Sequence, residues 1–84
     1  MGYFDVRLII EGFRGRLEDG LIDDAASMVE FGESKIGFEL LCDNLFEYGS
    51  PISEREYFIL LDVGVYLGCD VNSVRFECLK VLLE

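Results

Sequence analysis

Apolar residues recur along this chain at intervals of three and four residues, and glycine or proline interrupts the recurrence at short distances. This interval places apolar side chains on one face of an α-helix. The uninterrupted segments are too short to bury a core alone, so they must pack against one another. No repeat, linker or low-complexity tract divides the sequence. We therefore predict an all-α fold, a compact bundle of four or five short helices forming one domain over residues 1–84.

The first helix is expected to weaken in its second half. Gly12 and Gly15 interrupt the pattern there, and Glu18-Asp19-Gly20 ends it. Its apolar face consists of Val6, Ile9, Ile10, Phe13 and Leu17.

Two further helices are expected in the middle of the chain. The second ends near Gly32 and carries Asp23 and Asp24 in its first turn, where acidic side chains complement the helix dipole. Its apolar residues are Ile22, Ala25, Ala26 and Val29. The third runs from Glu33 to Tyr48 and is stopped by Gly49-Ser50-Pro51. Its apolar stripe consists of Ile36, Leu40, Leu41, Leu45 and Tyr48.

The fourth helix has the clearest start signal. Ser53, with Glu56 three residues later, forms a capping-box pattern. From Tyr57 to Leu67 only Asp62 and Gly64 are not apolar, so this helix is expected at the centre of the bundle. The alternative is that a second copy of the chain covers one of its sides.

The last segment fits two structures. Val74, Cys78, Leu79 and Leu82 follow a helical spacing that Asn72 or Asp70 could cap, whereas residues 74–78 also alternate as a strand would. We predict a helix, because a lone strand would have no partner.

The composition excludes several kinds of catalytic and metal-binding site. The chain has no histidine, which excludes histidine catalysis and histidine metal sites, and its serines have no histidine to activate them. Its cysteines have no CxxC spacing and are expected to be reduced and buried; they are Cys42, Cys69 and Cys78. No nucleotide-binding or EF-hand pattern occurs. We expect no enzyme activity, no cofactor and no metal. The N-terminus lacks a signal-peptide pattern, so a cytoplasmic location is expected.

The charge is concentrated in the middle of the chain. The net charge is −10, and residues 17–54 hold ten acids and one base, a net of −9. Such a surface repels bare nucleic acid and anionic membranes and attracts a basic protein.

Three of these acids share one helix face. Glu39, Asp43 and Glu47 follow one another at intervals of four residues, a spacing at which like charges destabilise a helix by about 0.2–0.5 kcal/mol per pair. An ordinary acidic surface kept for solubility is one explanation. The other, which we favour, is a patch shaped for a basic protein such as a nuclease, whose groove is cationic because it holds phosphates.

Residues 31–48, followed by Ser50-Pro51-Ile52-Ser53, resemble the MafI-like immunity proteins. These small helical proteins are encoded beside polymorphic toxins, including the contact-dependent growth inhibition systems of bacteria. Their recurring pattern is GE, then A-x-E-x-L-C-x-x-L-x-E, then a P-I-S turn. The matching residues are Gly32, Glu33, Glu39, Leu41, Cys42, Leu45, Glu47, Pro51, Ile52 and Ser53. Gly37 stands where the pattern often has alanine, and residues 13–17 extend the resemblance over most of the chain.

The resemblance implies an immunity protein that binds and neutralises one cognate toxin domain in the cytoplasm. Toxins paired with such proteins are often ribonucleases, of the EndoU or barnase-like types, so a basic ribonuclease domain is the expected partner. The matched acids Glu33, Glu39 and Glu47 are the first candidates for toxin contact. Charge and helix face, rather than the family pattern, add Asp43, Asp23, Asp24 and Glu30.

Structural roles remain open for some of these acids. Glu33 could cap the third helix, and Glu39 could pair with Arg14 or Arg16 inside the bundle. Two other functions also remain open: an acidic DNA mimic that regulates a nucleic-acid-binding protein, and an adaptor that self-associates through the fourth helix. A monomer is the expected state, with a dimer as the alternative.

Overall fold

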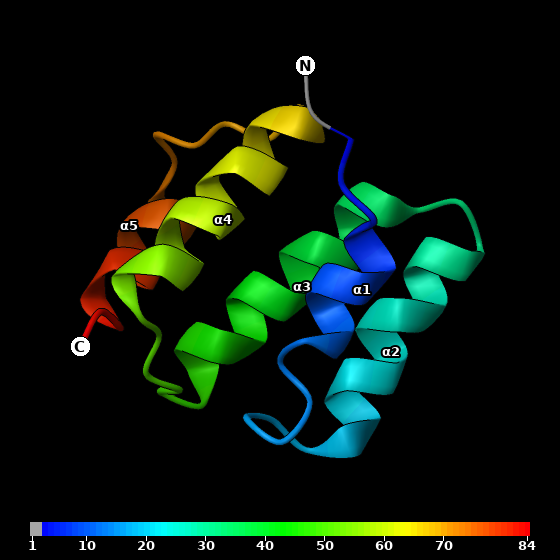
Figure 1. The fold of residues 1–84 in the computed structure, drawn as a ribbon, viewed down its shortest axis with the longest axis horizontal. Coiled ribbons are helices and arrows are strands. Elements are labelled where there is room, and N and C mark those ends of the chain that lie inside the picture. Colours follow the sequence, from blue (N-terminus) through cyan, green and yellow to red (C-terminus); the bar gives the residue numbers. More distant parts are fainter. Residues whose placement is uncertain (1–2) are drawn as a thin grey trace.

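The computed structural model describes residues 3–84, in which five α-helices and no β-strand occur (Figure 1). The helices are α1 (Val6–Glu11), α2 (Asp19–Glu30), α3 (Ser34–Glu47), α4 (Glu54–Tyr66) and α5 (Val74–Val81). The predicted all-α bundle is confirmed. The prediction of a helix in the last segment is also correct, although the N-cap of α5 is Ser73 and not Asn72 or Asp70.

The longest helix, α3, occupies the middle of the bundle. It contacts α1, α2 and α5, and α4 packs on α5, which lies at the edge of the bundle in this view (Figure 1). The prediction that the fourth helix is central is therefore wrong. Only one face of α4 is buried, and Phe58, Val65 and Tyr66 are exposed. No other helix of residues 3–84 covers this second side of α4, so its apolar side chains remain in contact with water.

The buried face of α3 also differs from the predicted stripe. Ile36 and Tyr48, which were expected inside, are 46% and 60% exposed. The residues that face inward are Gly37, Phe38, Leu41, Cys42 and Leu45. Phe38 is completely buried and lies against Phe76 of α5, with ring centroids 6.3 Å apart. Apolar side chains surround much of α3, so sequence spacing alone left two possible faces, and the large Phe38 ring occupies the core.

Caps and glycines set the helix boundaries. Asp5 accepts a hydrogen bond from the backbone amide of Leu8 at the start of α1. The prediction that Glu18-Asp19-Gly20 ends this helix is wrong, because α1 already stops at Gly12 and Asp19 and Gly20 begin α2. Because α2 begins at Asp19, Asp23 and Asp24 lie in its second turn and not in its first. The predicted capping box is confirmed: the Ser53 side chain accepts from the amide of Glu56 at 3.1 Å, and the Glu56 carboxylate accepts from the amide of Ser53 at 2.9 Å.

The segment after α5 returns to the start of α4. The amide of Ile52 donates to the carbonyl of Leu82 at 3.0 Å, and the amide of Glu84 donates to the carbonyl of Ile52 at 3.1 Å. Ile52 is buried, so this pair of bonds fixes the end of the described chain against the core.

A glycine allows α2 and α3 to approach each other closely. A Cβ atom at Gly37 would lie 2.5 Å from the carbonyl oxygen of Ala25, nearer than real Cβ contacts allow.

We expect Gly37→Ala to lower the free energy of unfolding by about 1–3 kcal/mol, because α2 and α3 must separate to admit the methyl group. Gly20→Ala is the matched control: Gly20 lies in α2, and no atom would lie within 4 Å of its Cβ. That control should be stabilising by up to about 1 kcal/mol, since alanine restricts the unfolded chain. Urea unfolding of both variants measures the two changes in the free energy of unfolding. If both substitutions stabilised or both destabilised the protein, the close approach of α2 and α3 would be contradicted.

Candidate functional site

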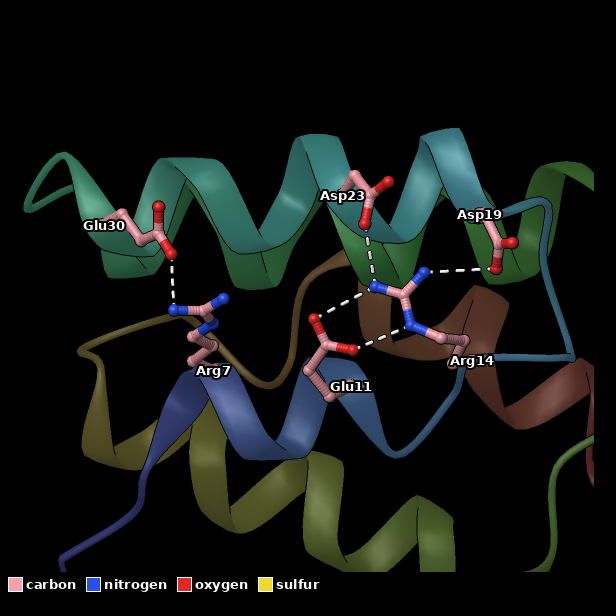
Figure 2. A network of polar contacts seen from close by, with 6 residues as sticks. All are labelled: Arg7, Glu11, Arg14, Asp19, Asp23 and Glu30. Carbon is pink, nitrogen blue, oxygen red and sulfur yellow. Dashed lines mark hydrogen bonds and ion pairs between the residues drawn. The ribbon is translucent and has the colours of Figure 1, made fainter.

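One cluster of charges joins α1 to α2 (Figure 2). Arg14 lies at its centre and pairs with Glu11 and Asp23 at 2.8 Å each and with Asp19 at 3.1 Å, while Arg7 pairs with Glu30. The hydrogen bonds to Glu11 and then Asp23 raise the pKa of Arg14, and the bond from Arg14 lowers the pKa of Glu11. Two predicted contact residues, Asp23 and Glu30, are thus engaged within the molecule.

A second cluster joins α3 to α5. The guanidinium of Arg75 donates to both carboxylate oxygens of Asp43, at 2.8 and 3.2 Å, and to Glu39 at 3.2 Å. The hydrogen bond to Asp43 is the main cause of a raised pKa at Arg75. Arg75 lies between carboxylates that are four residues apart on α3, so it offsets the like-charge repulsion that the sequence indicated.

The arginine that pairs with Glu39 differs from both expected ones. Arg14 is held by the α1–α2 cluster, and Arg16 contacts Glu56 and the carbonyl of Pro51. The pairing expected for Glu39 was therefore wrong in its partner, although an internal pairing does occur.

The remaining three predicted contact residues are exposed and form no ion pair with any of residues 3–84. They are Asp24 on α2, Glu33 at the N-cap of α3 and Glu47 at the last position of α3. Glu33 lies at the positive end of the α3 dipole, where a carboxylate is favourable even though it makes no side-chain cap bond. Glu47 lies at the negative end, where a carboxylate is unfavourable. The helix dipole therefore explains how Glu33 stabilises the fold, whereas no stabilising role in the fold is found for Glu47.

Asp43 and Glu47 line a groove of about 430 Å³ between α3 and α5. We call it the α3–α5 groove, and its lining residues are Cys42, Asp43, Phe46, Glu47, Val74, Arg75 and Cys78. Phe46 is 44% exposed and Val74 is 77% exposed. The groove thus combines carboxylates with accessible apolar side chains, the composition that protein partners recognise when an apolar anchor is surrounded by polar groups.

The sequence did not identify the apolar part of this groove. The spacing of Val74 predicts only that the last segment is a helix, and no role is predicted for Phe46. The only sequence signal for Phe46 is its place outside the expected apolar stripe of α3, between Leu45 and Glu47.

The structure divides the seven predicted contact residues between different surfaces. Asp23 and Glu30 face α1, whereas Glu39 and Asp43 face α5. Glu33 and Glu47 flank opposite ends of α3, which are about 20 Å apart at 1.5 Å per residue. The seven acids therefore do not form one continuous patch, and only Asp43 and Glu47 meet in a groove.

The three cysteines are free, and Cys42 is buried as expected. The expectation of burial is wrong for Cys69 and Cys78, which are only partly buried. Burial raises the pKa of Cys42, which disfavours the reactive thiolate. Within residues 3–84, no group of three or more cysteine or acidic side chains is arranged to hold a metal ion. None of the helices described here combines the length and apolar character needed to cross a membrane.

No family model matches this chain, and no curated protein or solved structure matches it either.

Proposed function

We propose that this protein is an immunity protein that binds a cationic toxin domain, with a ribonuclease as the first candidate, and blocks it stoichiometrically through the α3–α5 groove. The observation that carries the proposal is the meeting of Asp43 and Glu47 with exposed Phe46 and Val74 in one groove. The resemblance of residues 31–53 to MafI-like immunity proteins supports the same conclusion, and it implies action in the cytoplasm.

Long-range attraction supplies the first step of binding. A net charge of −10 draws a basic domain toward the inhibitor and raises the rate of encounter. The same charge keeps bare RNA away, so the inhibitor competes with the substrate for the toxin and does not bind the substrate itself.

The groove then supplies the specific contacts. Glu47 is free to pair with a lysine or arginine of the toxin, and its unfavourable place at the end of α3 costs stability that binding would recover. Phe46 and Val74 are exposed apolar side chains, and docking of the toxin would bury them away from water. Arg75 holds Asp43 in a fixed orientation beside them, which reduces the ordering cost of binding.

Blocking requires no chemistry by this chain. A toxin ribonuclease holds phosphates in a basic groove, and an acidic protein seated there excludes RNA. Asp23 and Glu30 contribute to the total charge in this proposal but not to the contact, because they lie on α2 and do not line the α3–α5 groove.

The test uses the toxin domain encoded beside this protein. A catalytically inactive form of that domain should co-elute with the protein at one toxin per chain, and co-expression should restore growth to cells that make the active toxin. Failure of both co-elution and growth rescue would reject the proposal. Rescue without complex formation would reject the stoichiometric mechanism.

A further inference from the structure

The outer face of α4 carries a stripe of four exposed residues, Arg55, Phe58, Asp62 and Val65. They are spaced by three and four positions, so they project from the same side of the helix. Phe58 is 55% exposed and Val65 is 65% exposed. The buried residues of α4 lie on its other side; they are Tyr57, Leu60, Val63 and Gly64. We call these four residues the α4 stripe.

The charges of the α4 stripe are unused within the described chain. Arg7, Arg14, Arg16 and Arg75 each pair with a carboxylate, whereas Arg55 makes neither an ion pair nor a hydrogen bond with any side chain of residues 3–84. The same is true of Asp62. Both side chains are exposed.

The stripe is complementary to itself. Arg55 and Asp62 are seven residues apart, which is about 10 Å along the axis and only about 20° around it. An antiparallel copy of α4, related by a two-fold axis passing beside Phe58, would place Arg55 opposite the partner's Asp62 and Asp62 opposite the partner's Arg55. The two Phe58 rings would meet between these pairs. An interface of this kind uses the same patch twice, as two-fold dimers do.

We infer that the α4 stripe is a docking site for a second copy of this chain. The balance of charge favours this occupant over a basic protein, because the stripe contains one cation and one anion while the charge excess lies elsewhere. Residues 55–84 hold three bases and five acids, a net of −2, against −9 for residues 17–54. The dimer leaves the α3–α5 groove available, since no α4 residue lines that groove. A contact through one helix face is small, so the dimer is weak.

Paired charge reversals test this interface. Sedimentation equilibrium and light scattering on the purified chain, over micromolar to millimolar concentrations, should detect a monomer–dimer equilibrium. Arg55→Asp and Asp62→Arg should each raise the dimer dissociation constant by about tenfold or more, because two attractive pairs become repulsive. A 1:1 mixture of the two variants should form a heterodimer, in which both cross-pairs are again opposite in sign. The double variant Arg55→Asp/Asp62→Arg should dimerise as the original chain does.

Two substitutions serve as controls. Lys35→Asp changes the net charge by the same amount as Arg55→Asp at another exposed position, and it should leave the equilibrium unchanged. Phe58→Ser should weaken the dimer, whereas Phe31→Ser, at a ring that is 78% exposed on the end of α2, should not. Because the mixing experiment recovers association from two variants, it also shows that both are folded.

Three outcomes would overturn the inference. The original chain could be monomeric throughout the concentration series, the mixed variants could fail to associate, or Lys35→Asp could weaken the dimer as much as Arg55→Asp. If Asp62→Arg instead abolished toxin binding by a monomeric chain, the stripe would belong to the toxin interface. Toxin binding and the dimer are measured separately, so either can fail without the other.

Discussion

Phe38→Ala is expected to lower the free energy of unfolding by about 3–5 kcal/mol. Phe38 is completely buried on α3, the helix that α1, α2 and α5 contact, and its ring lies against Phe76. Truncation removes apolar contacts on several sides and leaves a cavity that short helices close only in part. Since small domains have about 5–15 kcal/mol in total, this one change would leave the fold marginal.

Chemical denaturation of Phe38→Ala and of Phe46→Ala measures this effect against a control on the same helix. Phe46 is 44% exposed, so the same substitution there should cost far less. A similar loss in both variants would contradict the observed orientation of α3.

Reversing the charges of the α3–α5 groove should abolish protection against the toxin. Asp43→Lys with Glu47→Lys replaces two carboxylates by two cations where a basic partner is proposed to dock. Loss of two attractive contacts together with new repulsion should weaken binding by at least about a hundredfold. Glu39 is retained in this variant so that Arg75 keeps an acidic partner.

The control for this variant is Glu18→Lys with Glu54→Lys, which changes the net charge equally at exposed positions outside the groove. Titration calorimetry with inactive toxin gives the two affinities, growth rescue gives the two activities, and circular dichroism checks that both variants are helical. Equal losses in the two variants would mean that total charge matters and that the groove is not the contact.

The helix positions could be predicted because they depend on local chemistry. The capping box of Ser53 and Glu56, for example, acts through neighbouring backbone groups. The packing of the helices depends on distant residues. Phe38 faces the core, where it packs against Phe76 from α5, whereas Ile36 is exposed, and one face of α4 is exposed because no other described helix covers it.

The candidate site was predicted in part for the same reason. The spacing of Glu39 and Asp43 placed both on one face of α3, but their counterion, Arg75, lies 36 and 32 residues further along the chain. Composition gave the excess of acids without showing which of them were already paired. The spacing of Val74 predicts a helix but not its surroundings, and only the contact of α5 with α3 places it at the rim of the groove.

The arginines that form ion pairs between helices also determine the electrostatic potential of this molecule at long range. A carboxylate beside a guanidinium is a dipole, whose potential decays faster than that of a single charge. Dissolved ions screen both kinds of potential further, with a Debye length of about 8 Å at physiological ionic strength. An approaching cation therefore senses solitary anions such as Glu47 and Asp24 before it senses Asp23 or Glu30. The internal ion pairs thus leave a few unpaired carboxylates, which dominate the potential that orients an incoming basic protein.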